Sequence, residues 1–190
     1  GWRWGMDIAP MDAVEIWNGA MMIGSNEEAL CWWNAQLCQG RHLPAVGGSD
    51  FHREGPMSLP GMPTTCVYAL SRAPEDILLA LRKGNCFLSM TPDGPEVDMT
   101  CAQAGMGDTV SHASPVQLRF SHLKGGDLLR IITDRTQEDT LCPLGTLTAQ
   151  LAFAQTGVRF VRCEVLRCLV PGAAPQRVMV SNPMYFNPEE

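Results

Sequence analysis

Positive charge is scarce in this sequence, which has 14 Lys and Arg residues against 20 Asp and Glu and a net charge of -6 at pH 7. Residues 1–94 contain 6 basic and 10 acidic side chains, and residues 95–190 contain 8 and 10, so neither half is basic. A protein that binds long nucleic acids normally presents a cationic face. The charge balance therefore predicts no nucleic-acid partner, although a small phosphorylated ligand is compatible with it.

Long apolar runs, a secretory signal and metal-type cysteine pairs are also missing. The longest apolar stretches fall far short of the ~20 residues that a membrane-spanning helix needs, and no basic-then-apolar segment opens the chain. None of the eight cysteines forms a C-x-x-C pair, and the spacing of Cys163 and Cys168 does not match a zinc knuckle. We expect reduced thiols rather than a disulfide framework, no membrane association and a cytoplasmic protein.

The first half of the chain has the order of elements typical of an α/β domain. The predicted helix after Ser25 has Leu30, Trp33 and Leu37 on one face and ends at Gly40. Alternating strands and helices favour a parallel sheet. The predicted strands are 13–18, 43–48, 65–69 and 85–89, and the predicted helices are 26–39 and 74–83.

The second half changes character after residue 92. Short strand-like segments are separated by turns rich in Gly, Pro and Asp, with no helical stripe between them. This pattern predicts a small antiparallel β-sandwich-like domain over residues 93–190, following an α/β domain over residues 1–92. The predicted strands are 116–120, 128–133, 145–153, 158–166 and 177–181.

Asp50 and His52 are the candidate metal ligands. They directly follow an apolar strand, and α/β folds place ligand sites at the carboxyl ends of such strands. Residues two apart on an extended chain point to the same side, so the carboxylate and the imidazole can converge on one ion. Such a pair suits Zn, Mn or Fe better than Ca. The plain alternative is a capping Asp beside a solvent-exposed His.

The Asp50–His52 pair belongs to a series of motifs along the chain. These are Val14-Glu15-Ile16-Trp17-Asn18-Gly19, Trp33…Leu37…Gly40-Arg41, Gly47 to His52, Pro63 to Tyr68, Ile77 to Gly84 and Val180 to Tyr185. In this order they resemble the PHP (polymerase and histidinol phosphatase) superfamily of metal-dependent phosphoesterases, in its CehA-like branch. The segment from Gly47 to His52 is similar to the last metal-binding motif of that superfamily.

The resemblance implies the C-terminal part of a distorted (β/α) barrel whose mouth holds divalent ions and hydrolyses phosphate esters, or other esters, with a metal-activated water. Asp50 and His52 would then be metal ligands. Glu15 and Asn18 become candidates for the site or for a supporting role around it, and a hydrogen bond at a strand end is the alternative for Glu15. Arg53 and Arg41 are candidate contacts for a substrate phosphate, because guanidinium groups bind phosphate oxygens in pairs.

The sequence also departs from the family pattern. The N-terminal His-x-His of the family is absent, and no His precedes His42. The α/β segment is much shorter than the ~250 residues of a full barrel. We therefore expect the chain to lack part of the metal cluster, to bind one ion weakly at most, and to be inactive unless another segment or chain supplies the rest. The competing hypothesis is a non-catalytic binding module whose β-rich domain recognises a partner or a glycan.

Overall fold

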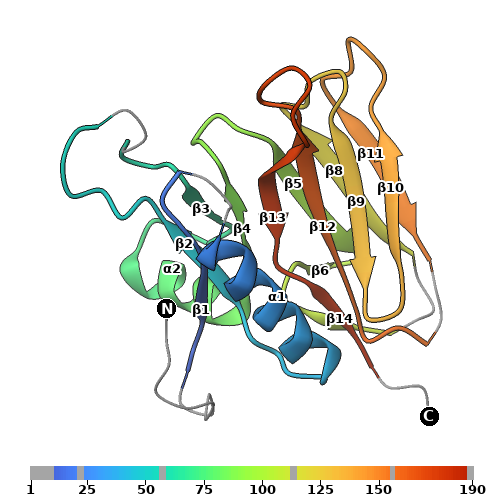
Figure 1. Ribbon diagram of the computed structural model, residues 1–190. Coiled ribbons are helices and arrows are strands. Elements are labelled where there is room, and N and C mark those ends of the chain that lie inside the picture. Colours follow the sequence, from blue (N-terminus) through green and yellow to red (C-terminus); the bar gives the residue numbers. More distant parts are fainter. Residues whose placement is uncertain (1–10, 21–23, 56–58, 112–114, 155–156, 188–190) are drawn as a thin grey trace.

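A computed structural model describes residues 11–20, 24–55, 59–111, 115–154 and 157–187 of the chain. Across these ranges the protein has two helices and fourteen strands (Figure 1). In chain order they are β1 (Val14–Asn18), α1 (Ser25–Cys38), β2 (Ala45–Gly48), β3 (Thr64–Val67), α2 (Pro74–Lys83), β4 (Cys86–Ser89), β5 (Glu96–Cys101), β6 (Ala104–Gly105), β7 (Thr109–Val110), β8 (Val116–Ser121), β9 (Leu128–Thr133), β10 (Gln137–Leu141), β11 (Ala149–Phe153), β12 (Phe160–Arg167), β13 (Gln176–Ser181) and β14 (Met184–Phe186).

Two mainly antiparallel sheets form the body of the molecule. The large sheet has the strand order β10-β9-β12-β13-β4-β3, with β14 added beside β12 and β7 beside β14. The smaller sheet has the order β11-β8-β5-β6. A separate pair, β1 and β2, is parallel and is joined through α1.

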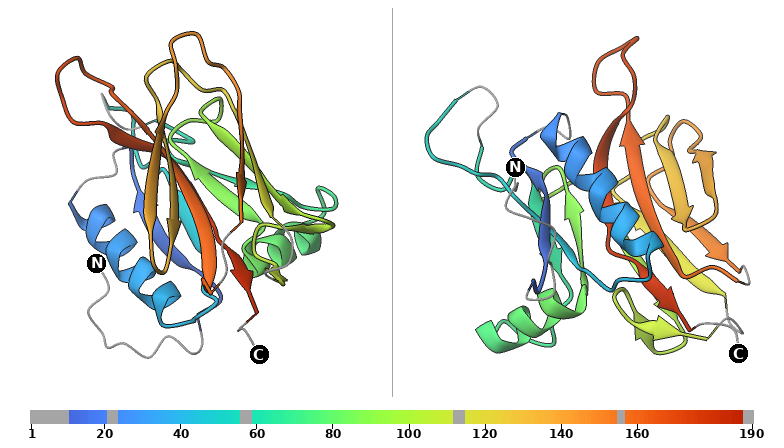
Figure 2. Two further views of the ribbon diagram at one scale, coloured as in Figure 1. Left: turned by 90° about the vertical axis from the view of Figure 1, so that its right-hand side faces the viewer. Right: turned by 60° about the horizontal axis from the view of Figure 1, so that its bottom comes forward.

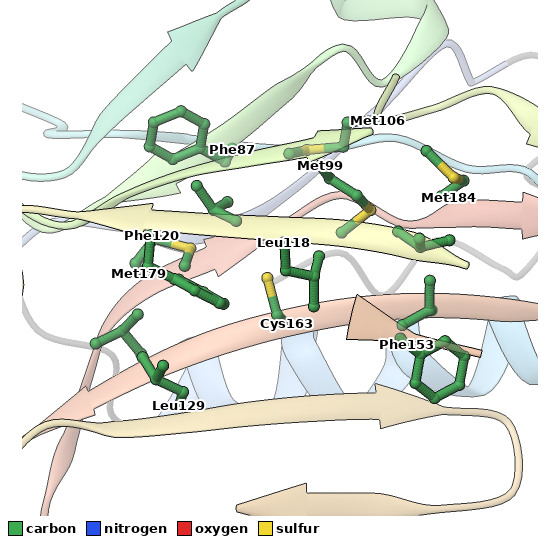
Figure 3. Packing of buried hydrophobic residues seen from close by; sticks show 14 of the residues in the cluster. Phe87, Met99, Met106, Leu118, Phe120, Leu129, Phe153, Cys163, Met179 and Met184 are labelled. Atoms are coloured by element: carbon green, nitrogen blue, oxygen red, sulfur yellow. The ribbon is translucent and has the colours of Figure 1, made fainter. Parts of the chain in front are cut away.

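The main core lies between the two antiparallel sheets. Apolar and polar side chains alternate along β8, so that Val116, Leu118 and Phe120 are buried while Arg119 is exposed. Figure 3 shows side chains of the small sheet facing those of the large sheet across this core. Full burial of one such side chain contributes roughly 1.5–3 kcal/mol, so this cluster of twenty buried residues is the principal source of stability.

Helix α1 covers the opposite face of the large sheet (Figure 2). Trp33 of α1 is fully buried, and its Nε1 donates to the carbonyl oxygen of Leu43 at 2.7 Å. A second apolar cluster here joins α1 and the β1–β2 pair to Phe160 and Val180 of the large sheet. Because both faces of β12 are covered, nearly every residue of this strand is buried.

The prediction of a PHP-type (β/α) barrel portion is wrong for the part of the chain that the structure describes. In that part of the chain, strands contain far more residues than helices do. The main sheets are antiparallel, and only two helices are present. The segments expected to form a strand-helix-strand unit do form β3, α2 and β4, but β3 pairs antiparallel with β4. Helix α2 lies at the end of these strands, with Leu78 and Leu79 more than half exposed (Figure 1). It is therefore not the crossover helix of a parallel sheet.

The large sheet runs across residue 92. Its strands β3 and β4 precede that residue, and β4 pairs with β13 through Leu88 and Val180. The buried side chain of Asn182 adds to this connection, since its Nδ2 donates to the carbonyl oxygens of Ala45 and Cys86, both at 2.9 Å. Residues on either side of the predicted domain boundary thus share one sheet.

None of the helices in the described ranges is long and apolar enough to cross a membrane.

Candidate functional site

The parallel pair β1–β2 positions the residues predicted to bind metal. The two strands end together, with Asn18 opposite Gly48. Strand β2 passes so close to β1 that a Cβ on Gly47 would lie 2.8 Å from the carbonyl oxygen of Trp17, so only glycine fits there. Past Gly48 the chain leaves the sheet and leads to Asp50 and His52 at the carboxyl end of the pair.

Asp50 and His52 lie next to each other, although the chain is not extended at Asp50, as the prediction had assumed. His52 Nδ1 is 2.6 Å from the carbonyl oxygen of Asp50 and 3.6 Å from its Oδ1. Two acceptors therefore face Nδ1, which favours the tautomer with the proton on Nδ1 and the lone pair on Nε2. Ligating histidines often have this arrangement, with one ring nitrogen donating to a carbonyl and the other free for the metal.

Both side chains are open to solvent, with 53% of Asp50 and 78% of His52 exposed. Asp50 also has a φ of +48°, a left-handed conformation that a non-glycine residue adopts infrequently. Such a backbone can turn the chain sharply at a functional loop. Since so little of the His52 side chain is covered, its ring can rotate to bring either nitrogen toward the Asp50 carboxylate.

Glu15 and Asn18 belong to the same end of the parallel pair. Asn18 Nδ2 donates to Glu15 Oε2 at 3.2 Å, and Glu15 Oε1 would lie 3.4 Å from a Cβ on Gly48. The backbone of Asn18 is fixed by Asn26, whose side chain accepts from the Asn18 N–H and donates to its carbonyl oxygen. This reciprocal pair ties the end of β1 to the beginning of α1 and so holds the Glu15 and Asn18 side chains in place.

The two candidate arginines lie at different ends of β2. Arg53 is exposed and directly follows His52. Arg41 precedes β2, and its N–H donates to the carbonyl oxygen of Gln36 at 3.1 Å beyond the end of α1. Arg53 is therefore beside the Asp50–His52 pair, whereas Arg41 is not brought to it. A phosphate contact by either arginine stays a prediction.

The described residues do not complete a metal site. They contain no group of three His, Cys, Asp or Glu side chains arranged to hold an ion. A catalytic zinc site uses three protein ligands, and a structural one uses four. Asp50 and His52 supply two of these at most, so the donor set that lies within the described ranges does not by itself fit a catalytic divalent ion.

A second candidate site is a pocket of about 400 Å³ on the outer face of the small sheet. Asp98 and Arg119 are opposite each other in the register of β5 and β8, and both are exposed. The Tyr68 hydroxyl donates to the carbonyl oxygen of Val97 at 2.8 Å, which fixes the ring at the pocket edge with 44% of its area exposed. Burial, with added repulsion from Asp98, raises the pKa of that hydroxyl, so it stays protonated.

Only part of this second pocket can be predicted from the sequence. The alternation along β8 indicates that Gln117, Arg119 and Ser121 share an outer face. It does not indicate that Tyr68, from a segment almost thirty residues before Val97, lies beside them. Only the pairing of β3 into the large sheet brings that ring to the pocket.

Comparison of the chain with protein-family models, with curated proteins and with solved structures gives no match. The resemblance to the PHP motifs is therefore an expectation that rests on the residues alone.

Proposed function

We propose that this chain contributes Asp50 and His52 to the divalent-metal site of a hydrolase that acts on a small phosphorylated or ester substrate. The observation that supports the proposal is that His52 Nδ1 lies 2.6 Å from the Asp50 carbonyl oxygen at the carboxyl end of a parallel strand, which leaves Nε2 available as the ligating nitrogen. Both side chains are exposed, so the Asp50 carboxylate and His52 Nε2 can turn toward one ion bound at ~2.1 Å from each. Glu15 lies over Gly48 beside the pair and can support or join the ligand set.

The remaining ligands of such a site lie outside the described residues. The resemblance to the last PHP metal motif supports this division, because that superfamily takes its other ligands from motifs that the chain lacks. Mn, Zn and Fe are the ions that suit a carboxylate and an imidazole. When bound, such an ion would supply an activated water and stabilise negative charge on the substrate oxygens. Arg53, next to His52, is the candidate contact for a substrate phosphate.

Metal titration tests this proposal directly. Purified protein is titrated with Zn²⁺ and Mn²⁺ by calorimetry, beside the Asp50→Ala/His52→Ala double variant. We expect weak binding by the parent chain and at least a tenfold loss in the variant. The matched control is Asp12→Ala/His122→Ala, which removes one exposed carboxylate and one exposed imidazole from other parts of the surface. Equal metal binding by all three proteins would exclude Asp50 and His52 as ligands.

Hydrolysis is tested separately, because metal binding does not by itself show catalysis. A generic phosphate monoester and a generic carboxylic ester are offered to the protein in the presence of the ion that binds best. Turnover that disappears in Asp50→Ala/His52→Ala and persists in Asp12→Ala/His122→Ala supports the hydrolase. Metal binding without turnover of either ester would contradict it.

The pocket on the small sheet favours a second candidate function, recognition of a glycan or another polyhydroxylated partner. Carboxylate and guanidinium groups such as Asp98 and Arg119 bind neighbouring hydroxyl groups in pairs, and the face of Tyr68 offers an apolar surface for a sugar ring. Here the measurement is oligosaccharide binding by parent, Asp98→Asn and, as a control on β10, Glu138→Gln. Binding that only Asp98→Asn weakens supports this function. Binding that is absent, or equal in all three proteins, contradicts it.

A further inference from the structure

The end of α1 lies near the turn between β9 and β10 (Figure 1). Residues of both segments line a different pocket, of about 330 Å³. Its lining includes Leu37, His42, Arg135, Val158, Arg159 and Tyr185. His42 precedes β2, whereas Asp50 follows it, so this pocket and the proposed metal ligands belong to opposite ends of that strand. Its volume suits a small molecule rather than a polymer.

Arg135 is the most distinctive group in this pocket. Four other arginines in the same half of the chain each have a carboxylate oxygen at 2.7 or 2.8 Å, and these are Arg130, Arg162, Arg167 and Arg177. Within the described ranges the structure gives the Arg135 guanidinium no such partner, although its backbone N–H donates to the Thr133 hydroxyl. An arginine that lines a pocket without a counter-charge is suited to an anionic ligand.

The Arg135 guanidinium lies over the backbone of Gly157. A Cβ at position 157 would lie 2.9 Å from Arg135 Nη1, so a larger residue there would push the guanidinium aside. Gly157 also has a φ of +71°, which other residues rarely adopt.

Arg159 adds a second positive charge, part of which Asp134 offsets. The Arg159 backbone N–H donates to Asp134 Oδ1 at 2.8 Å, its Nε lies 4.0 Å from Asp134 Oδ2, and its Nη1 donates to the carbonyl oxygen of Cys38 at the end of α1. Arg135, Arg159 and Asp134 together leave a charge of +1. This local charge is opposite in sign to the net charge of the whole protein.

The rest of the lining is aromatic or apolar. His42 stacks on Tyr185, with ring centroids 3.7 Å apart and an angle of 11° between the planes. Burial lowers the pKa of His42, so its imidazole is neutral at pH 7 and offers a hydrogen bond rather than a charge. Leu37, Val158 and Phe186 are buried side chains that border the same space. Among the residues that the structure describes, the pocket thus combines a guanidinium that has no carboxylate partner with an apolar wall.

We propose that this pocket binds a small organic anion, with the phosphate or carboxylate group on Arg135 and its apolar body against Leu37 and Val158. The two head groups share the chemistry that a guanidinium recognises, namely paired anionic oxygens. This inference is independent of the proposed metal site, since no residue is common to both.

Calorimetric titration with phenyl phosphate and with benzoate tests the inference and identifies the head group. Benzyl alcohol serves as the neutral analogue. We expect at least one of the two anions to bind the parent protein at about 10 mM or below, Arg135→Gln to weaken that binding at least tenfold, and benzyl alcohol not to bind. Arg135 is exposed at the surface, so this variant is expected to fold.

Arg72→Gln is the matched control, because it removes an exposed arginine from the loop before α2. Its affinity is expected to stay within twofold of the parent value. The proposal is overturned if neither anion binds, if Arg135→Gln binds as tightly as the parent, or if Arg72→Gln loses as much affinity as Arg135→Gln. Raised salt is expected to weaken the interaction, as it does for other charge-dependent contacts.

Discussion

At the residue scale, Glu164 on β12 is the most constrained ionisable group. Its side chain is buried, with Oε1 2.7 Å from Arg162 Nη1 and Oε2 2.7 Å from Arg177 Nε. Burial by itself would raise the pKa of this carboxyl, but the two guanidinium groups hold it below its ordinary value. Arg162 also bonds to Asn34 and Arg177 to Glu27, so the network joins α1 to the large sheet.

Replacement of Glu164 by Gln is expected to lower the free energy of unfolding by about 3–5 kcal/mol at pH 7, because the buried guanidinium of Arg162 loses its counter-charge and the half-buried guanidinium of Arg177 keeps only Glu27. A lowered folded pKa contributes stability that is present above the unfolded pKa of 4.5 and lost as the pH falls through the folded value. The free energies of unfolding of parent and variant should therefore differ less at pH 3 than at pH 7. Urea unfolding of both proteins at both pH values measures this difference.

The control for this prediction is Glu138→Gln on β10, which changes an exposed carboxylate in the same sheet. It should alter stability by less than about 0.5 kcal/mol at either pH. If Glu164→Gln lowers the free energy of unfolding equally at pH 7 and at pH 3, loss of the carboxylate charge is not the cause of the lower stability.

The eight cysteines differ widely in their surroundings. Cys31 and Cys168 are exposed, whereas burial raises the pKa of Cys86 and of Cys163 to about 12. Because the thiolate is the reactive form, we expect only the two exposed thiols to react rapidly with a disulfide reagent at pH 8. All eight should react in urea. The double variant Cys31→Ser/Cys168→Ser is expected to lose the rapid phase of this reaction. A rapid phase that remains in the variant would contradict the assignment of that phase to Cys31 and Cys168.

At the scale of elements, α1 and α2 show that a similar sequence pattern can have different structural consequences. Both helices carry apolar residues three and four positions apart. In α1 these residues, including Leu37, are buried against the large sheet, but in α2 one of them, Leu78, is 54% exposed. The difference arises because α1 lies across a sheet face and α2 lies at a strand end (Figure 2).

A matched pair of leucine substitutions tests this difference. Leu37→Ala is expected to cost about 2–5 kcal/mol of stability, because it leaves a cavity in a packed cluster. Leu79→Ala removes the same atoms from a side chain that is mostly in solvent and should cost less than about 1 kcal/mol. Urea midpoints of the two variants give the comparison. Similar losses would mean that α2 is covered in solution.

At the scale of the whole molecule, the shared large sheet is the feature that links both halves of the chain. Strands β3 and β4 from the first half are hydrogen-bonded into the sheet that β13 continues. Asn182 accepts from the Ala45 N–H at 2.7 Å, which fixes β2 to the segment after β13. Separation of the halves would expose β4 and β13 and leave these buried polar groups without partners.

We therefore expect the protein to unfold in a single cooperative transition. All five tryptophans lie within residues 1–33, so their fluorescence reports on the first half, whereas far-ultraviolet circular dichroism reports mainly on the strands of the second half. The two urea midpoints should coincide. Distinct midpoints would show that the predicted domains, 1–92 and 93–190, fold independently.

Local patterns in the sequence identified most strands and both helices. The alternation along Val116–Ser121 and the stripe of Leu30, Trp33 and Leu37 follow from periods that a strand or a helix imposes on a half-buried segment. The position of Asp50 and His52 after an apolar strand was also readable from the sequence. The route to their close approach was not, because Asp50 has a left-handed φ of +48° and the rule for an extended chain does not apply there.

Strand pairing and the pockets were decided only by the tertiary structure. The sequence could not show that β3 pairs antiparallel with β4, since a helix between two strands is compatible with either direction until its packing is known. It could not bring His42, Arg135 and Tyr185 into one pocket either, because these residues are separated by tens of positions. The sequence by itself determined which segments are strands and helices, because those depend on neighbouring residues. The tertiary structure determined direction, burial and contact, because those depend on segments that meet only when the whole chain has folded.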